Sequence, residues 1–271
     1  MAPGDMYFIE HLNELRIRFI RVVAFAIAVV IISSVFGIHI ITINNFSFYF
    51  LYPSVYNNIS SQTIFFLSHN LLPHGVKLIQ TAPGQALFAQ IYIAFLLSIT
   101  CTVPLIVKEL IGFISPAISN RSKKITYLHY ILPITILFLA GIIFSFLVAI
   151  PIMLTFLYQY GQSLGILSFL TINEFINFVL QFFIAFGISF QLPLVMYVLS
   201  STGLIDNRFW IKNFKYALIL IIIFGAFITP DGSGITMWFI SIPMILLYVL
   251  GILSVKIKSD KEKKTLNNKQ Y

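Results

Sequence analysis

The N-terminal segment holds the side chains best suited to bind a cationic ligand. Glu10, Glu14 and Arg18 follow one another at intervals of four residues, so a helix would place them on one face. Another face would carry an apolar stripe that consists of Phe8, Leu12, Leu15 and Phe19. Two interpretations stay open: the segment is an interfacial helix with solvated charges, or its carboxylates receive a cationic peptide.

Another carboxylate lies beside an aromatic ring in a connecting segment. Glu109 and Phe113 are one helical turn apart, and Pro116 follows as a helix stop. An ordinary loop at the end of a helix is the simplest interpretation of this pattern.

Gln191 is polar although the residues around it are apolar. Burying a side-chain amide without a partner costs about 1–3 kcal/mol, so this group needs a hydrogen bond. Pro193 frees a backbone carbonyl, which would supply one such partner. We weigh a structural role at a kinked helix equally with a functional polar site at membrane depth.

Several turn positions are interpreted as structural. Thr171 and Glu174 have the spacing of a capping box that begins a helix. Asp231 lies in a Thr-Pro-Asp-Gly turn, where it would cap the next helix or stabilise the turn. Pro53 punctuates a loop.

The chain lacks the sequence patterns of an enzyme. It contains no G-x-x-x-x-G-K-[ST] phosphate loop, no H-E-x-x-H zinc motif and no G-x-S-x-G nucleophile motif. The five histidines are dispersed, and the single cysteine, Cys101, lies in an apolar run. We expect no catalytic residues, no metal site and no cofactor, so any work must draw on a gradient or on a partner.

The elements that would position these residues are helices in a membrane. The chain has 271 residues, of which 59% are hydrophobic and 10% charged, whereas soluble domains are about half apolar and a quarter charged. Six apolar segments approach the roughly 20 residues that cross a bilayer. They cover about 18–40, 86–107, 125–150, 174–199, 214–229 and 235–253. We predict an all-α polytopic membrane protein whose last two spans are short.

The basic residues predict the orientation of these spans. All but one of the 17 lysines and arginines flank the start of the first segment, follow the last, or lie in the two connections on the same side. Such residues concentrate on the cytoplasmic side, so we expect both termini there. This placement explains the net charge of +8 without nucleic acid as a partner.

Residues 1–253 form one predicted transmembrane domain, and 254–271 form a charged cytoplasmic tail that we expect to be disordered. The loop 37–85 on the outer side is polar but aromatic. Short interfacial or cap helices are expected in this loop.

Taken together, these patterns resemble the TatC family. His11-Leu12-x-Glu14-Leu15-Arg16-x-Arg18 is similar to the family's N-terminal signature. Phe113-x-x-Pro116 resembles the end of its first cytoplasmic connection, and Phe186-Gly187-x-Ser189-Phe190-x-x-Pro193 resembles its fourth span. Gly141 through Pro151, and Thr229-Pro230-Asp231 followed by Ile242-Pro243, are similar to its third and last two spans. The resemblance covers about residues 8–253, and the order and spacing of the motifs make it specific.

The resemblance implies a concave, glove-like arrangement of six helices and a role in protein export. The family receives folded precursors that bear twin-arginine signal peptides. With single-span TatA- and TatB-type subunits, it moves them across the plasma (inner) membrane using the proton-motive force. The resemblance also implies a homo-oligomer within a larger complex.

Signal recognition would fall on Glu14, within the signature that includes Leu12 and Arg16, and on a surface that includes Phe113. A carboxylate suits this task because guanidinium is permanently charged and offers planar donors.

The sequence departs from the family pattern at three acidic positions, one of which is Gln85 in the outer loop. The family has an acid before the basic pair of the first cytoplasmic connection, whereas Ser122 stands there in this chain. We hypothesise that Glu10 or Glu109 supplies the second carboxylate for two arginines. The acid common in the fourth span is Gln191 here, so that site would need a hydrogen-bonding group rather than a charge.

Other classes of function fit the sequence less well. A secondary transporter of a small solute is the main alternative, but it predicts charges near the membrane midplane, and the apolar segments hold hardly any. A structural scaffold is a third interpretation, and an intramembrane enzyme would lack its nucleophile or metal motif. Copurification of single-span partners and signal-bearing precursors would separate a translocase from a transporter.

Overall fold

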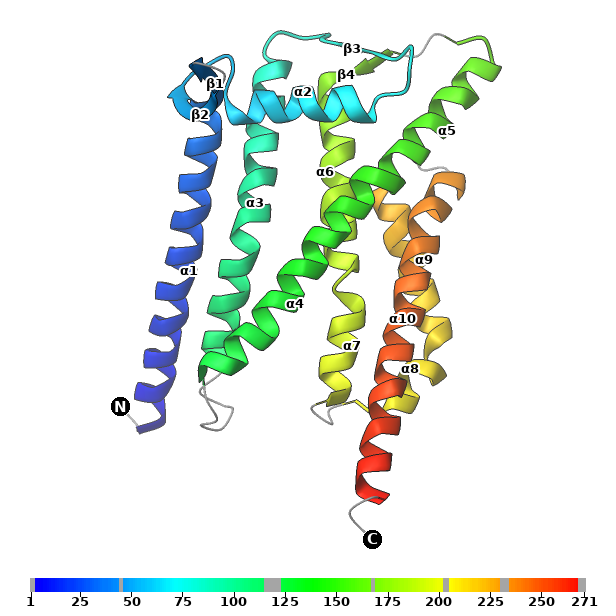
Figure 1. Ribbon diagram of the computed structural model, residues 1–271. Helices are drawn as coiled ribbons and strands as arrows, with labels where there is room; N and C mark the ends of the chain where they lie inside the picture. Colours follow the sequence, from blue (N-terminus) through cyan, green and yellow to red (C-terminus); the bar gives the residue numbers. More distant parts are fainter. Residues whose placement is uncertain are drawn as a thin grey trace. The chain divides into compact units, whose positions relative to one another are not determined.

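The computed structural model describes residues 3–43, 46–114, 123–166, 169–201, 205–229 and 234–267. Figure 1 shows the elements in chain order. They are α1 (Pro3–Val35), β1 (Phe36–Ile43), β2 (Phe46–Pro53), α2 (Ile59–Leu71), β3 (Lys77–Ile79), α3 (Gln85–Ile114), α4 (Lys123–Phe144), the π-helix η2 (Ser145–Ala149), α5 (Ile150–Ser163), β4 (Phe169–Thr171), α6 (Ile172–Ser189), α7 (Leu192–Ser201), α8 (Asn207–Lys212), α9 (Phe214–Ile228) and α10 (Gly234–Asn267). The chain divides into two compact units: residues 1–136 with 167–180 form unit 1, and residues 137–166 with 181–271 form unit 2.

The described part of the chain is mostly helical and contains helices of membrane-spanning length. Four stretches, 85–110, 131–163, 172–201 and 234–258, are long and apolar enough to cross a bilayer, and α9 is a shorter apolar helix. Together with α1, these helices occupy the six segments that the sequence predicted. The prediction of a mostly helical, polytopic membrane protein is therefore confirmed.

The ends of two predicted spans differ from the structure. The third span continues beyond Pro151, because the π-helix η2 joins α4 to α5 without a break. In this π-helical turn the N–H of Ile150 donates to the carbonyl of Ser145, five residues back. The last span is not short, since the apolar part of α10 extends to Lys258. The helix itself runs on to Asn267, into the segment predicted as a disordered tail, where lysine and glutamate are good helix formers.

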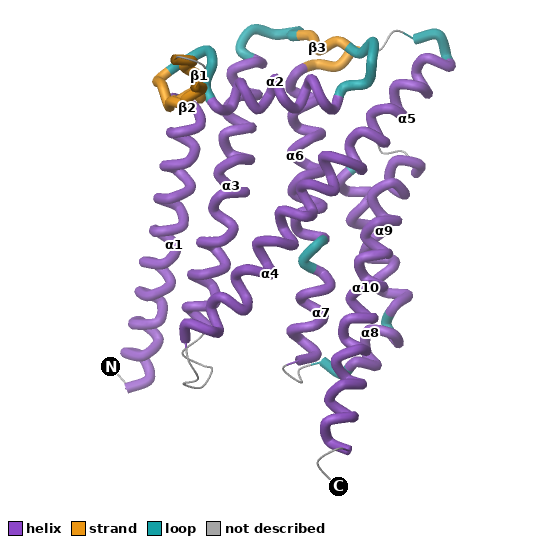
Figure 2. Tube along the Cα trace, in the orientation of Figure 1, coloured by secondary structure: helices purple, strands orange, loops and turns teal. Residues whose placement is uncertain are grey.

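Strands occupy part of the segment between α1 and α3. α1 ends at Val35, so residues 36–40 of the predicted first span belong to β1. β1 pairs antiparallel with β2, with Phe36 opposite Pro53, and β3 pairs in parallel with β4 (Figure 2). The expected helix is present as α2, but the strands were not predicted. The fold is thus mostly, not entirely, α-helical, because isoleucine, phenylalanine and tyrosine favour strands once the chain leaves α1.

Within unit 1, α1 and α3 lie side by side and antiparallel, and α2 crosses their ends (Figure 1). Ser98 on α3 donates its hydroxyl to the carbonyl of Ala26 on α1 at 2.8 Å, so the helices approach closely. Asn58 caps α2 by accepting from the N–H of Ser61, and it donates to the carbonyl of Ser34 at 2.8 Å. The cap therefore ties α2 to the end of α1.

The predicted capping box begins α6 and is confirmed. The hydroxyl of Thr171 donates to Oε2 of Glu174 at 2.8 Å, and the Thr171 N–H donates to the same oxygen at 3.1 Å. In return, the N–H of Glu174 donates to Oγ1 of Thr171 at 3.3 Å.

Within unit 2, small residues allow helices to pack closely around aromatic rings. A Cβ at Gly141 on α4 would collide with the backbone carbonyl of Phe186 on α6, and one at Gly251 on α10 would collide with the sulfur of Met196 on α7. The rings of Phe144 and Phe186 lie 5.3 Å apart between centroids. This interior is held by close packing, as expected of helices in lipid.

Candidate functional site

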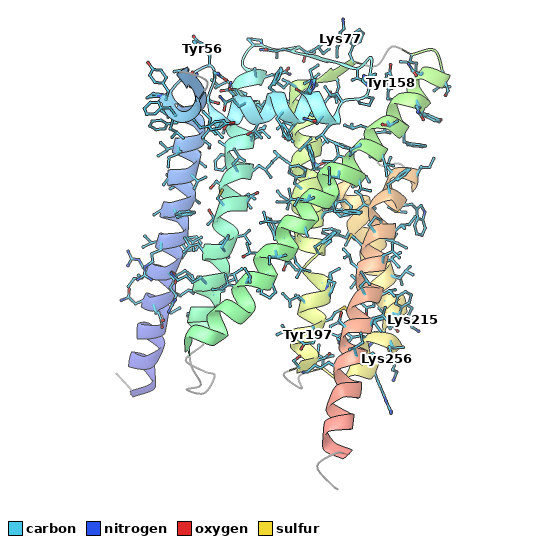
Figure 3. The ribbon with its side chains drawn as sticks, in the orientation of Figure 1. Tyr56, Lys77, Tyr158, Tyr197, Lys215 and Lys256 are labelled. Carbon is cyan, nitrogen blue, oxygen red and sulfur yellow. The ribbon has the colours of Figure 1, made fainter. Side chains whose placement is uncertain are left out.

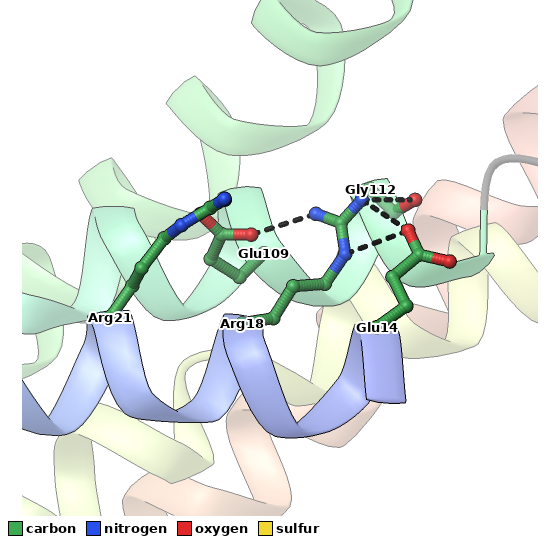
Figure 4. Close-up of polar contacts among 5 residues, drawn as sticks. All are labelled: Glu14, Arg18, Arg21, Glu109 and Gly112. Atoms are coloured by element: carbon green, nitrogen blue, oxygen red, sulfur yellow. Dashed lines mark hydrogen bonds and ion pairs between the residues drawn. The ribbon is translucent and has the colours of Figure 1, made fainter. Parts of the chain in front are cut away.

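The middle turns of α1 and the last turns of α3 bring together four charged side chains. We call them the Arg18 cluster, which consists of Glu14, Arg18, Arg21 and Glu109 (Figure 4). The three members on α1 are spaced at i, i+4 and i+7, so they share one face of that helix. Glu109 comes from α3, which packs along α1.

Arg18 lies between the two carboxylates. Its Nη1 donates to Oε2 of Glu109 at 2.7 Å. Its Nη2 and Nε donate to Oε1 of Glu14 at 2.7 and 3.1 Å, and Nη2 also donates to the carbonyl of Gly112 at 3.3 Å. A single guanidinium therefore bridges α1 and α3 through charge-assisted hydrogen bonds.

The two carboxylates differ in burial. The side chain of Glu109 is 8% exposed, that of Glu14 is 38% exposed, and that of Arg18 is 22% exposed. The second oxygen of Glu109, Oε1, lies 3.5 Å from Nη1 of Arg21, which is 61% exposed. Because a buried carboxylate is costly without a cation, the two arginines make the charge of Glu109 tolerable at this position.

An open pocket of about 330 Å³ adjoins the cluster. It is lined by Asn13, Glu14, Ile17, Arg18 and Arg21. A ligand in this pocket would meet the exposed side of the Glu14–Arg18 pair. All five lining residues belong to α1, so the pocket reaches Glu14 directly, whereas Glu109 meets it only through the shared guanidinium of Arg18. Two carboxylates from separate helices that share one guanidinium have the geometry to accept a planar cation.

Leu12 and Arg16 do not belong to this cluster. Each precedes a cluster residue of α1 by two positions, which is about 200° around a helix. Both side chains are exposed, Leu12 to 49%. The structure therefore places these two predicted residues on the opposite face of α1.

The remaining residues predicted near this site lie on α1, on α3 and in the connection after α3. Phe113 is on α3, one turn after Glu109, and is partly exposed. Glu10 falls within α1, but its side chain is outside the described residues, as is Ser122.

Gln191 lies in unit 2, at the break between α6 and α7. Its Nε2 donates to the carbonyl of Gly187 at 3.4 Å, while its backbone N–H donates to the carbonyl of Ile188 at 2.9 Å. Pro193 sits in the first turn of α7, where a missing N–H costs little. The side chain thus has a backbone carbonyl one turn back among its partners, at a helix break.

The sequence also singled out two turn residues, Pro53 and Asp231. Pro53 is exposed at the end of β2. Asp231 lies outside the described residues. Among the residues that the structure describes, no three His, Cys, Asp or Glu side chains are grouped to hold a metal ion.

Arg18 and Arg21 were not among the predicted site residues. The sequence signal for Arg18 is its i, i+4 spacing from Glu14. Its contact with Glu109 spans 91 residues and depends on how α1 packs on α3, so no local pattern indicates it.

Comparisons with known proteins place the chain in a family. The family model described as Sec-independent protein translocase protein (TatC) matches residues 10–243. The Sec-independent protein translocase protein TatC of Cenarchaeum symbiosum (strain A) is 46% identical over 261 residues, which cover 96% of this chain and 98% of that protein. The protein of the same name from Carboxydothermus hydrogenoformans is 31% identical over 262 residues, covering 97% and 98%.

A solved structure agrees with these relatives. The crystal structure of a Twin Arginine Translocase Receptor, TatC, matches with a TM-score of 0.74 and 27% identity, covering 92% of this chain and 99% of that one. The match is to a translocase subunit rather than to an enzyme, in agreement with the sequence prediction. The chain therefore belongs to the TatC family of Sec-independent protein translocase proteins.

Proposed function

We propose that this protein is the receptor subunit of a twin-arginine translocase and that the Arg18 cluster is its signal-peptide site. The observation that supports the site is the convergence of Glu14 and Glu109, from two helices, on one guanidinium. A signal-peptide arginine carries the same group, so it would fit the same acceptors. Family membership supplies the class of ligand.

In this proposal Glu109 takes the role of the acid that is missing at Ser122. Glu10 and Glu109 were both candidates, and the geometry favours Glu109 because it shares a guanidinium with Glu14. Phe113, one turn away on α3, would contact apolar residues next to the arginines. Leu12 and Arg16, on the opposite face of α1, would meet other parts of the peptide or a partner subunit.

The receptor is proposed to work in the plasma (inner) membrane, with both termini in the cytoplasm. The distribution of charge within unit 2 supports this orientation: Lys215 and Lys256 lie at one end with Tyr197, and Tyr158 lies at the other (Figure 3). In unit 1, Tyr56 is 92% exposed at the hairpin end, where aromatic residues would meet the outer membrane–water interface.

Export would require partners that the chain itself does not contain. We propose single-span TatA- and TatB-type subunits, further copies of this protein within one complex, and the proton-motive force as the source of energy. Gln191 would act in transport rather than in signal binding, through its hydrogen-bonding amide. Its position in unit 2, outside the Arg18 cluster, supports this division of roles.

Peptide binding to the purified protein in nanodiscs tests the receptor site. Twin-arginine and twin-lysine versions of one fluorescent signal peptide are titrated against wild type, Glu14→Gln and Glu109→Gln by anisotropy. We expect wild type to prefer arginine and each variant to bind at least about tenfold more weakly, because a hydrogen bond to a charged group contributes about 1.5–3 kcal/mol. Asp206→Asn is the matched control, since Asp206 is an exposed carboxylate that makes no capping bond to α8.

The outcomes separate the parts of the proposal. Equal affinity for the two peptides, in folded wild type, would remove the receptor role. A loss of binding in Glu14→Gln but not in Glu109→Gln would keep that role and assign the second carboxylate to Glu10, which Glu10→Gln then tests.

A further inference from the structure

We propose that Arg18 is an internal stand-in for the signal-peptide arginine. It occupies the two-carboxylate acceptor in the resting protein, and a signal peptide binds by displacing it. The inference rests on the proposed receptor function of the Arg18 cluster. It adds a specificity-determining residue to that site, because a built-in competitor sets the threshold that a peptide must exceed.

The hydrogen bonds show that the acceptor is occupied. Arg18 donates to Glu14 and to Glu109 at 2.7 Å each, and to the carbonyl of Gly112 at 3.3 Å. These acceptors come from both α1 and α3, so Arg18 occupies both of the carboxylates that the proposed site offers. An incoming arginine would take over these bonds, because one oxygen of each carboxylate already accepts from Arg18.

The charges of the cluster lead to the same conclusion. Two carboxylates face two guanidinium groups, so the cluster is neutral. A twin-arginine motif carries two positive charges and gains little attraction from a neutral site. When Arg18 leaves, Glu14, Glu109 and Arg21 together carry one negative charge, and the site attracts a cation.

The structure also provides a route for the exchange. The side chain of Arg18 is partly exposed and lines the open pocket beside Asn13 and Ile17. In the exchange, its side chain would rotate into this space. Glu109 would keep Arg21 nearby, 3.5 Å from its second oxygen, so the buried carboxylate always has a cation beside it.

Displacement would strengthen the preference for arginine over lysine. Arg18 donates to Glu109 through Nη1 and to Glu14 through Nη2 and Nε, so three nitrogens of one guanidinium form the hydrogen bonds to the two carboxylates. A lysine has a single nitrogen and cannot reproduce this pattern. A peptide lysine would therefore form fewer hydrogen bonds than the Arg18 that it displaces. A peptide arginine would restore the same hydrogen bonds, and contacts made by the rest of the peptide would then favour the exchange. An acceptor without Arg18 would bind either cation.

The test removes the competitor and measures both affinity and selectivity. Full-length wild type, Arg18→Gln and Arg18→Lys are placed in nanodiscs, and their affinities for the twin-arginine and twin-lysine peptides are compared. We expect Arg18→Gln to bind the twin-arginine peptide about tenfold more tightly than wild type does. The gain in affinity for the twin-lysine peptide should be larger, so that the selectivity for arginine over lysine falls. Arg18→Lys should shift both values in the same direction by less, because lysine is the weaker competitor. Arg208→Gln, which removes an exposed arginine of α8, is the matched control and should change neither value.

Glu14→Gln distinguishes a failure of this inference from a failure of the receptor site. If Glu14→Gln loses binding while folded Arg18→Gln binds at wild-type strength or more weakly, the receptor site stands and the stand-in role is wrong. If Glu14→Gln binds normally, both proposals are wrong. Should Arg18→Gln not fold, Arg18→Lys decides, because it keeps the charge that Glu109 needs: unchanged or weaker binding with unchanged selectivity would overturn the inference.

Discussion

Glu109→Gln should weaken the attachment of α1 to α3. The substitution is nearly isosteric but removes the charge that Arg18 contacts at 2.7 Å and that Arg21 approaches to 3.5 Å. Arg18 would then keep Glu14 and the carbonyl of Gly112 as acceptors. The variant therefore isolates the electrostatic contribution of one carboxylate without leaving a cavity.

The expected loss follows from the burial of the pair. Removing one partner of a fully buried ion pair costs about 3–5 kcal/mol, whereas exposed pairs contribute about 0–1 kcal/mol. Glu109 is 8% exposed, but Arg18 is 22% exposed and retains Glu14, so the cost lies between these limits. We expect the free energy of unfolding to fall by about 1–2 kcal/mol.

Unfolding in mixed micelles, followed by circular dichroism, measures this loss. Asp206→Asn should change the free energy of unfolding by less than about 0.5 kcal/mol, as surface substitutions do. The double variant with Arg18→Gln should lose less than the sum of the single variants, because both remove the same contact. A loss no larger than that of Asp206→Asn, or strict additivity with Arg18→Gln, would show that this ion pair does not hold the two helices together.

Two further predictions concern unit 2. Gln191→Leu should abolish transport of a twin-arginine precursor while expression and signal binding persist, since leucine keeps a side chain of similar size in this apolar segment and removes only the hydrogen-bonding amide; transport at the wild-type rate would show that the amide is not needed. Gly141→Ala should lower the free energy of unfolding by about 1–3 kcal/mol, because the new Cβ collides with the carbonyl of Phe186. Gly234→Ala, where no atom lies within 4 Å of the new Cβ, should be close to neutral in the same measurement.

Local patterns in the sequence were sufficient for some of this structure. The capping box of Thr171 and Glu174 involves four consecutive residues, so its spacing alone predicts the hydrogen bonds observed. One partner of Gln191 is likewise local, a carbonyl one turn away. The helical segments followed from long apolar runs, which only a membrane explains.

The hairpin was missed because its signal is ambiguous. Residues 36–43 are apolar and directly continue α1, and a short apolar run is compatible with a helix or a strand. The better signal was the next run, 46–53, which is rich in aromatic residues and separated by only two asparagines. The pair together, rather than either run alone, predicts strands.

The Arg18 cluster shows where sequence reasoning reaches its limit. Glu14 and Glu109 were both candidates, but whether they meet depends on the rotation of α1 against α3. Close contacts such as that between Ser98 and Ala26 fix this rotation, and they bring Glu109 rather than an exposed neighbour to Arg18. A rotation of α1 by about 100°, one residue, would carry Arg18 away from this carboxylate.

Arg18 also reduces the electrostatic repulsion between the two carboxylates of the proposed receptor site. Two unpaired carboxylates in one site repel each other, so the helices that carry them would separate or the nearest cation would enter. Arg18 holds Glu14 and Glu109 at the spacing that a guanidinium requires, before any peptide arrives. Such preorganisation reduces the ordering cost of binding, and the exchange of one guanidinium for another keeps the charge of the site constant. Glu109 on α3 can therefore do what Ser122 cannot, because it carries a carboxylate and because its contact with Arg18 holds that carboxylate where the peptide arginine would bind.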